Sequence, residues 1–155
     1  RSFEGASKRL QLMSQNDHCS VFLDFAHAPS KVQATTQALK EKYEDRKLTA
    51  CLELHTYSSL NKKFISNYQD TLHAADRACV YFNPKNQKQQ EENKIGEADI
   101  EQAFNIEKLN IFTDEHEMER FLLNQQWKHH NLLMMTSGHF GNLDLKSLAN
   151  HITQS

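Results

Sequence analysis

The 155-residue sequence contains few of the residues that interrupt regular structure, with only four glycines and two prolines. Long helices and strands are therefore expected, because glycine and proline most often break them. Cysteine is scarce too, and the three that occur (Cys19, Cys51 and Cys79) are scattered and odd in number. This pattern argues against a disulfide framework and favours reduced, buried thiols in a cytoplasmic protein.

Long apolar runs and a large excess of charge of one sign are also absent. No stretch approaches the roughly 18 apolar residues of a membrane helix, and no signal-peptide pattern opens the chain. The 18 Lys and Arg nearly balance the 20 Asp and Glu, for a formal net charge of −2. Neither nucleic acid nor a membrane is therefore an expected partner, and the length suits one domain.

Several motifs of nucleotide and metal sites are missing. Without GxxxxGK[ST] the chain is not expected to cradle a nucleoside triphosphate alone, and without GxGxxG it does not fit a dinucleotide-binding domain. There is no HExxH or CxxC pattern, and the nine histidines lack ligand spacing, so no metal site is expected.

Five short runs rich in β-branched or aromatic residues predict the strands. They are continuous rather than alternating, which is typical of strands buried on both faces. The runs cover residues 19–24, 48–54, 77–82, 109–113 and 131–136, and a short strand is added at 10–13.

Apolar residues at helical spacing lie between these runs and predict helices over 32–43, 64–72, 118–122 and 143–152. Ser30 with Gln33, and Asp114 with Glu117, have the spacing of helix caps. The alternation of strand and helix predicts an α/β fold, a mostly parallel sheet of five or six strands with helices on both faces. The polar stretch 84–97 is interpreted as an exposed loop.

Three loops after predicted strands are rich in polar groups, and ligands of open α/β sheets bind at such loops. In the first, Asp24 could accept hydrogen bonds from a ribose diol, and His27 lies where the next helix would favour a phosphate. Simple helix capping by Asp24 is an equally good interpretation from spacing alone.

The second loop places His55, Tyr57 and Ser58 near the start of a predicted helix, where they could hold a carboxylate or phosphate. Capping by Ser58 or Ser59 is the simpler alternative. The third loop, 136–142, contains Gly138 and Gly141, and glycines let the backbone approach a ligand closely.

Taken together, the loops resemble a known family. DFAHAP at 24–29 is similar to the D-[YF]-[AG]-H-x-P signature that opens the C-terminal domain of Mur ligases and folylpolyglutamate synthetases. FEGASKRLQ at 3–11 resembles the F-x-G-x-x-R-R-x-E segment before it. HTYS at 55–58 resembles the H-x-[YF]-S stretch of muramate-binding members, and SGHFG at 137–141 the S-N-G-x-F-G stretch of murein peptide ligases.

The resemblance implies a Rossmann-like, three-layer αβα domain over residues 1–155, a fragment of a three-domain enzyme, with 1–17 as the segment that follows the central domain. Such enzymes join UDP-N-acetylmuramate to a peptide or amino acid through an acyl phosphate, in peptidoglycan biosynthesis or recycling. ATP and Mg²⁺ are mainly held by the central domain, and the partners of this domain are the substrates and the enzyme's own N-terminal and central domains. The isolated domain is expected to be inactive.

The resemblance also assigns roles to individual residues. Asp24 would bind the ATP ribose, His27 would lie near the phosphates, and Arg9 would contact the terminal phosphates. The incoming substrate would be held by the remaining candidates: His55, Tyr57, Ser58, Ser137, Gly138, His139 and Phe140.

Three positions depart from the family pattern. Lys8 replaces the first arginine of the usual pair, Gln11 a common glutamate, and His139 a glycine. The alternatives are the C-terminal domain of a UDP-N-acetylmuramate–L-alanine ligase, that of a folylpolyglutamate synthetase, and a non-catalytic α/β binding module.

Overall fold

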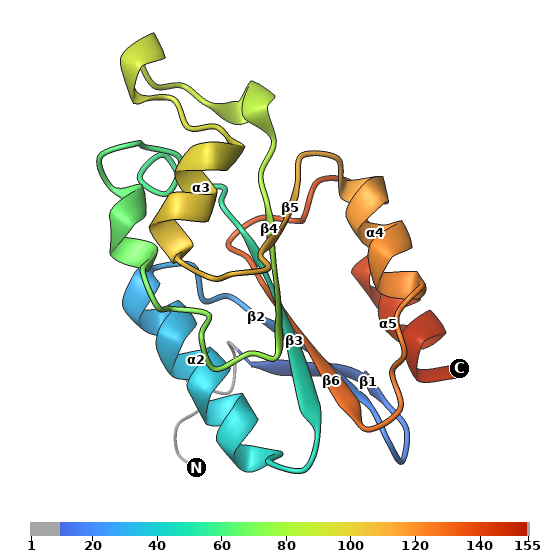
Figure 1. Cartoon of the computed structure of the whole chain (residues 1–155). Coiled ribbons are helices and arrows are strands. Elements are labelled where there is room, and N and C mark those ends of the chain that lie inside the picture. The colour runs from blue at the N-terminus through green and yellow to red at the C-terminus, as the bar shows by residue number, and fades with distance from the viewer. Residues whose placement is uncertain (1–9, 155) are drawn as a thin grey trace.

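Six strands form one sheet in residues 10–154, the part of the chain that the computed structural model describes (Figure 1). The strand order is β1-β2-β6-β3-β4-β5, and all neighbouring pairs are parallel except β1 with β2. The strands are β1 (Gln11–Gln15), β2 (Ser20–Asp24), β3 (Lys47–Glu53), β4 (Arg77–Tyr81), β5 (Asn110–Phe112) and β6 (His130–Met135).

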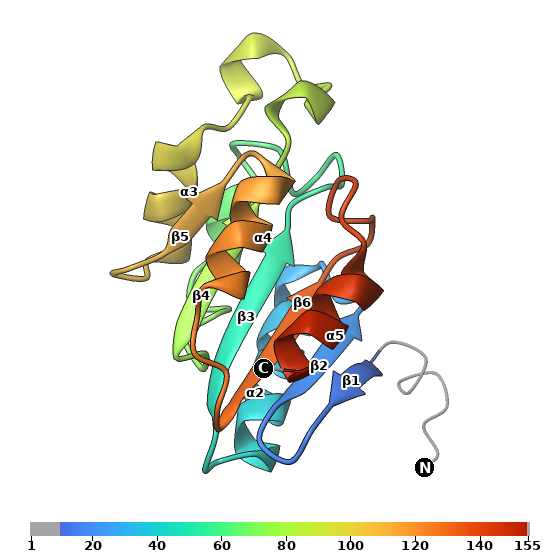
Figure 2. The same cartoon turned by 90° about the vertical axis from the view of Figure 1, so that its right-hand side faces the viewer.

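Helices cover both faces of this sheet. One face carries α2 (Pro29–Lys42) and α3 (Glu97–Phe104), and the other carries α4 (Glu115–Leu123) and α5 (Leu145–Gln154) (Figures 1 and 2). Three short 3-10 helices complete the order: η1 (Ile65–Tyr68), η2 (Pro84–Asn86) and η3 (Glu91–Asn93). The α/β fold with a mostly parallel sheet is confirmed.

The sheet divides the apolar interior into two clusters, because successive residues of a strand point to opposite faces. On β3, Leu52 packs in the cluster under α2 and α3, whereas Cys51 packs in the cluster under α4 and α5. Cys51 lies beside Cys79 of β4, and all three cysteines are free and buried. Strands covered on both sides explain the continuous apolar runs of the sequence.

Two helix predictions are wrong. The apolar spacing over 64–72 belongs to turns and the short helix η1, and Asp70 breaks the helical path with a φ of 67°. Ser30 does not cap α2, because the helix begins at Pro29 with Ala28 at its N-cap. Asp114 does cap α4, and its side chain accepts a hydrogen bond from the backbone N–H of His116.

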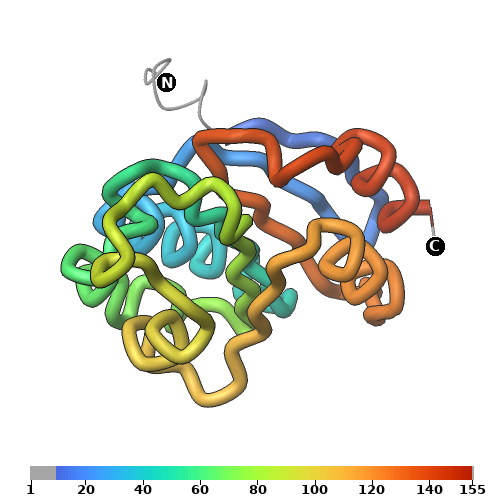
Figure 3. Tube along the Cα trace, turned by 90° about the horizontal axis from the view of Figure 1, so that it is seen from above, coloured from blue at the N-terminus to red at the C-terminus, as the bar shows by residue number. Residues whose placement is uncertain are grey.

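The helix α3 was not predicted. It begins at Glu97, the last residue of the polar stretch, and Ile100, Ala103 and Phe104 form its buried side. The polar stretch itself is mostly exposed, but Gln89 and Ile95 are buried in it. Figure 3 looks down on the carboxyl ends of the parallel strands, with this stretch (yellow-green) on the side of α2 and α3.

Candidate functional site

The carboxyl ends of β2, β6 and β3 lie side by side at one edge of the sheet. After β2 and β3 the chain turns toward the face of α2, whereas after β6 it turns toward α5 on the opposite face. Neighbouring strands whose connections diverge in this way leave a crevice where open α/β sheets bind ligands. The three loops singled out from the sequence therefore meet at this edge.

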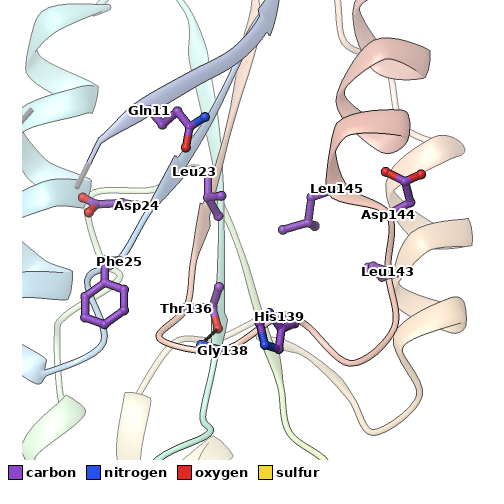
Figure 4. A pocket seen from close by; sticks show the side chains of 10 residues that line it. All are labelled: Gln11, Leu23, Asp24, Phe25, Thr136, Gly138, His139, Leu143, Asp144 and Leu145. Atoms are coloured by element: carbon purple, nitrogen blue, oxygen red, sulfur yellow. Dashed lines mark hydrogen bonds between the residues drawn. The ribbon is translucent and has the colours of Figure 1, made fainter. Parts of the chain in front are cut away.

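A pocket of about 400 Å³ opens at the ends of β2 and β6 (Figure 4). Three of the predicted site residues line it: Asp24, Gly138 and His139. The other lining residues, which the sequence did not mark as site residues, are Gln11, Leu23, Phe25, Thr136, Leu143, Asp144 and Leu145.

The walls of this pocket differ in character. Figure 4 shows Leu23 and Leu145 facing one another across the opening, with Asp24 and Asp144 on opposite sides. The described part of the wall includes two carboxylates and neither lysine nor arginine. Such a wall suits sugar hydroxyls or an amine better than a phosphate, because carboxylates accept hydrogen bonds and repel anions.

Asp24 is fixed where β2 ends. It is buried, and its Oδ1 accepts a hydrogen bond from the backbone N–H of Ala26 at 3.2 Å. Its carbonyl accepts a hydrogen bond of 3.0 Å from the backbone N–H of Thr136. The first and third loops are thus joined through Asp24, so its carboxylate has a defined place at the side of the pocket.

His27 lies beside this pocket rather than in its wall. Its Nδ1 donates to the carbonyl of Phe25 at 3.0 Å, which leaves Nε2 for another partner. The Tyr68 hydroxyl donates to the His27 carbonyl at 2.5 Å, and burial raises the pKa of that hydroxyl. His27 is therefore held just before the N-terminus of α2 by the Phe25 carbonyl of its own loop and by the Tyr68 hydroxyl of η1.

The third loop is anchored on Glu53, the last residue of β3. Oε1 of Glu53 accepts hydrogen bonds from Oγ1 of Thr136 at 2.5 Å and from the backbone N–H of Phe140 at 2.8 Å. Glu53 was not among the predicted site residues, although an acidic residue inside an otherwise apolar strand is a signal of such a role.

Gly138 and His55 bring the second and third loops into contact. A Cβ at position 138 would lie 2.9 Å from Cδ2 of His55, so the ring packs directly against the glycine backbone. Nδ1 of His55 lies 3.8 Å from Oε2 of Glu53. Next to Gly138 in the chain, Oγ of Ser137 is buried without a hydrogen-bond partner among the described atoms.

Phe140 is a buried anchor of the third loop. Its side chain is fully buried next to Tyr81, with a distance of 6.2 Å between the ring centroids.

Ser58 of the second loop is exposed. The neighbouring Ser59 is buried, and its Oγ accepts a hydrogen bond of 3.0 Å from the Thr56 hydroxyl. The local turn is thus fixed by Ser59, and Ser58 stays free to meet solvent or a ligand.

Tyr57 stands at the outer rim, with 63% of its surface exposed. Its carbonyl accepts a hydrogen bond of 2.5 Å from Nε2 of Gln89, which comes from the stretch between β4 and α3. A second contact joins the same two segments, from the backbone N–H of Lys62 to the carbonyl of Asn93 at 2.9 Å. The polar stretch therefore lies against the second loop.

The predicted site residue Arg9 lies outside the described residues, as does Lys8. Gln11, which replaces the glutamate common in the resembled motif, opens β1 and lines the pocket.

The profile of the family described as Mur ligase, glutamate ligase domain, matches residues 8–138. The fold, with its crevice at the ends of β2 and β6, is that of a ligase domain, and the chain belongs to the Mur ligase family. The family prediction is confirmed.

Curated relatives include UDP-N-acetylmuramate–L-alanine ligases. The UDP-N-acetylmuramate–L-alanine ligase of Lactobacillus helveticus is 34% identical over 79 residues, which are 51% of this chain and 18% of that protein. The chain thus matches less than a fifth of the length of this curated relative. The counterpart in Lactobacillus delbrueckii subsp. bulgaricus is 37% identical over 78 residues, 50% of this chain and 17% of that protein.

Solved structures share the fold at low sequence identity. The murein peptide ligase of Psychrobacter arcticus superimposes with a TM-score of 0.74 at 19% identity, over 99% of this chain and 32% of that chain. A domain described as part of a UDP-N-acetylmuramate:L-alanyl-γ-D-glutamyl-meso-diaminopimelate ligase of Haemophilus ducreyi gives 0.63 at 22% identity, over 92% of this chain and 99% of that domain.

Within residues 10–154, no helix has the length and apolar character needed to cross a membrane. In the same residues, no group of three or more His, Cys, Asp or Glu side chains is placed to hold a metal ion.

Proposed function

We propose that this chain is the C-terminal domain of a three-domain, ATP-dependent amide-forming ligase that joins UDP-N-acetylmuramate to a peptide or an amino acid. The observation that carries the proposal is the meeting of Asp24 with the 136–140 loop at one pocket in the crevice of the sheet. Family membership and the ligase names of the relatives support it.

In this reaction ATP phosphorylates the muramoyl carboxylate, and the amine of the second substrate attacks the acyl phosphate to form an amide and release phosphate. The residues of this chain bind and orient the reactants. Asp24 accepts hydrogen bonds from the ribose hydroxyls, which suits a pocket wall with two carboxylates. His27 lies near the phosphates at the start of α2, where the helix N-terminus favours negative charge.

The triphosphate and Mg²⁺ are held mainly by the central domain, and Arg9 contacts the terminal phosphates. This division agrees with the scarcity of cationic groups in the described pocket wall. The 55–58 and 137–140 loops hold the incoming amine substrate. They contact one another through His55 and Gly138, so one substrate can touch both.

Two classes of amine substrate remain in competition. The SGHFG loop, which resembles the S-N-G-x-F-G stretch of murein peptide ligases, favours a peptide. The sequence relatives favour L-alanine, since they are UDP-N-acetylmuramate–L-alanine ligases.

The proposal is tested with the full-length protein that contains this domain, supplied with ATP, Mg²⁺ and UDP-N-acetylmuramate. L-alanine and L-alanyl-γ-D-glutamyl-meso-diaminopimelate are offered side by side, and amide formation is followed together with phosphate release. We expect one of the two to be used, and no ATP turnover by the 155-residue chain alone. A full-length protein that uses neither substrate would refute the proposal.

A substitution separates the role of Asp24 from a general effect on folding. Asp24→Ala should raise the KM for ATP at least about tenfold, because loss of a buried charged acceptor for two hydroxyls removes more than 1 kcal/mol of binding. The matched control is Asp76→Asn, which lies outside the pocket wall. Asp76 accepts a hydrogen bond of 2.8 Å from the backbone N–H of Leu48, and asparagine keeps an oxygen for this bond, so ATP kinetics should stay unchanged.

A further inference from the structure

Glu53 occupies a junction between segments that are far apart in the sequence. It ends β3 and is only 4% exposed. It points to the same face of the sheet as Cys51 and Thr49, because side chains alternate along a strand. The second loop follows Glu53 directly in the chain, and the third loop rests on its carboxylate.

The hydrogen bonds around this carboxylate form a continuous chain. The backbone N–H of Gly138 donates to Oγ1 of Thr136 at 2.7 Å, and Thr136 donates to Oε1 of Glu53 at 2.5 Å. The backbone N–H of Phe140 donates to the same oxygen at 2.8 Å. Both ends of the 136–140 turn are thus fixed by one buried atom, and bonds to a charged acceptor are stronger than neutral ones.

The turn held in this way has an uncommon backbone. Phe140 has a φ of 53°, a conformation that residues other than glycine rarely adopt. Such a conformation persists only where surrounding contacts impose it. Here the contacts are the buried Phe140 ring and the bond from its N–H to Glu53.

The second oxygen of Glu53 faces the second loop. Nδ1 of His55 lies 3.8 Å from Oε2, and the His55 ring packs on Gly138 of the third loop. A movement of either loop therefore disturbs the packing of the other.

We propose that Glu53 is a positioning residue that joins the 55–58 and 136–140 loops into one preorganised surface for the incoming amine substrate. This inference rests on the proposed function, because it assigns the two loops to that substrate. Glu53 itself does not line the pocket beside Asp24. It acts through the 136–140 loop, which the proposed function assigns to the amine substrate.

Three variants test the inference. Glu53→Gln keeps an oxygen that accepts from Thr136 and Phe140, whereas Glu53→Leu removes every acceptor. Thr49→Val is the matched control, because it removes a buried hydroxyl from the same strand and face. Thr49 Oγ1 is hydrogen-bonded to Nε2 of His130 at 2.7 Å, near the amino ends of β3 and β6 and away from the loops.

The first measurement uses the 155-residue chain and follows the amide resonances of residues 136–140 and their hydrogen exchange. In Glu53→Leu the Phe140 amide should shift strongly and exchange at least about tenfold faster, because its charged acceptor is gone. Glu53→Gln should restore most of its protection, and Thr49→Val should leave these amides unchanged. Unchanged loop amides in folded Glu53→Leu would overturn the inference.

The second measurement uses steady-state kinetics of the full-length protein. Glu53→Leu should raise the KM for the amine substrate about tenfold or more while the KM for ATP stays within about twofold. Glu53→Gln should return the amine-substrate KM to within about threefold of the original. An equal rise of both KM values, or a rise in Thr49→Val of the same size, would contradict a positioning role.

The two proposals can fail separately. A full-length protein without ligase activity would refute the proposed function and, with it, the assignment of the loops to a substrate. The amide measurement would still decide whether Glu53 joins the loops. If the full-length protein is an active ligase and Glu53→Leu leaves its KM for the amine substrate unchanged, only the inference about Glu53 is refuted.

Discussion

Oε2 of Glu115, the first residue of α4, accepts a hydrogen bond of 3.0 Å from the backbone N–H of Asn142. Hydrogen bonds from the backbone N–H groups of Glu115 itself and of Asn142 lower the pKa of this carboxyl. Its Oε1 lies 3.4 Å from the hydroxyl of Tyr81, and burial together with this carboxylate raises the pKa of Tyr81 to about 12. The loop after β6 is thus fixed at its far end by a second carboxylate.

Gly141 lies under this contact, and we expect its replacement by alanine to destabilise the domain. The residue has a φ of 67°, and an added Cβ would lie 2.7 Å from the Glu115 carboxylate and 2.9 Å from the Tyr81 hydroxyl. Strained backbone and crowding together should lower the free energy of unfolding by about 1–3 kcal/mol, measured by urea denaturation. Gly96→Ala is the control, because an added Cβ meets nothing within 4 Å there.

Gly138 offers a second, more specific test of crowding. An alanine Cβ would meet the His55 ring at 2.9 Å, and this ring can move because its side chain is 41% exposed. Gly138→Ala should therefore lower the free energy of unfolding by about 1 kcal/mol, and His55→Ala should remove most of that loss in the double variant. Equal losses in both backgrounds would show that the ring contact is not the cause.

The sequence predicts the sheet well because strands buried on both faces have continuous apolar runs. The run at 48–54 corresponds to β3, and the run at 131–136 to β6, each shifted by one residue. Apolar residues at helical spacing predict helices less reliably, because such residues can be buried without forming a helix. Tyr68 has helical spacing from its apolar neighbours, yet it is buried because its ring stacks on Phe104 of α3, 5.2 Å between centroids. Tertiary contacts had produced a pattern that resembles a helix.

The site was predictable to the extent that it follows strand ends. Asp24 ends β2, and Gly138 and His139 lie in the loop that follows β6, so the parallel sheet brings them to one pocket. Leu143 and Leu145 complete that pocket because α5 packs back over the sheet. Local sequence patterns do not predict this packing. The anchoring roles of Glu53 and Glu115 depend on backbone groups 87 and 27 positions away, and spacing cannot show such partners.

His130 gives the domain a pH dependence that can be measured. The residue is buried, and desolvation, with a smaller effect of Arg77, lowers its pKa from 6.5 to about 4. As pH falls from about 6.5 to about 4, the unfolded chain takes up a proton that the folded chain does not. The free energy of unfolding should therefore decrease over this range, by up to about 3 kcal/mol in total.

The variant His130→Gln isolates this contribution. Glutamine cannot take up a proton in this range and can still reach the hydroxyl of Thr49, so the decrease should become shallower. His18→Gln, with an exposed side chain, serves as the control and should leave the slope as it was. Equal slopes for His130→Gln and the unmodified chain would contradict the assignment.

The segment between β4 and α3 should resist proteolysis despite its polar composition, and Gln87 should be the reason. The Gln87 side chain donates to the carbonyl of Ile95 at 3.0 Å and accepts from the Ile95 N–H at 2.8 Å, which closes the segment on itself. Ile95 is buried, so this closure also fixes the start of α3. Gln87→Ala removes both hydrogen bonds, so local opening of the segment should become easier by about 1–2 kcal/mol. Trypsin cleavage at the exposed Lys88 should therefore accelerate by about tenfold. Asn86→Ala, at the exposed neighbouring position, should leave the rate unchanged, and equal rates for both variants would show that the bonds to Ile95 do not hold the segment closed.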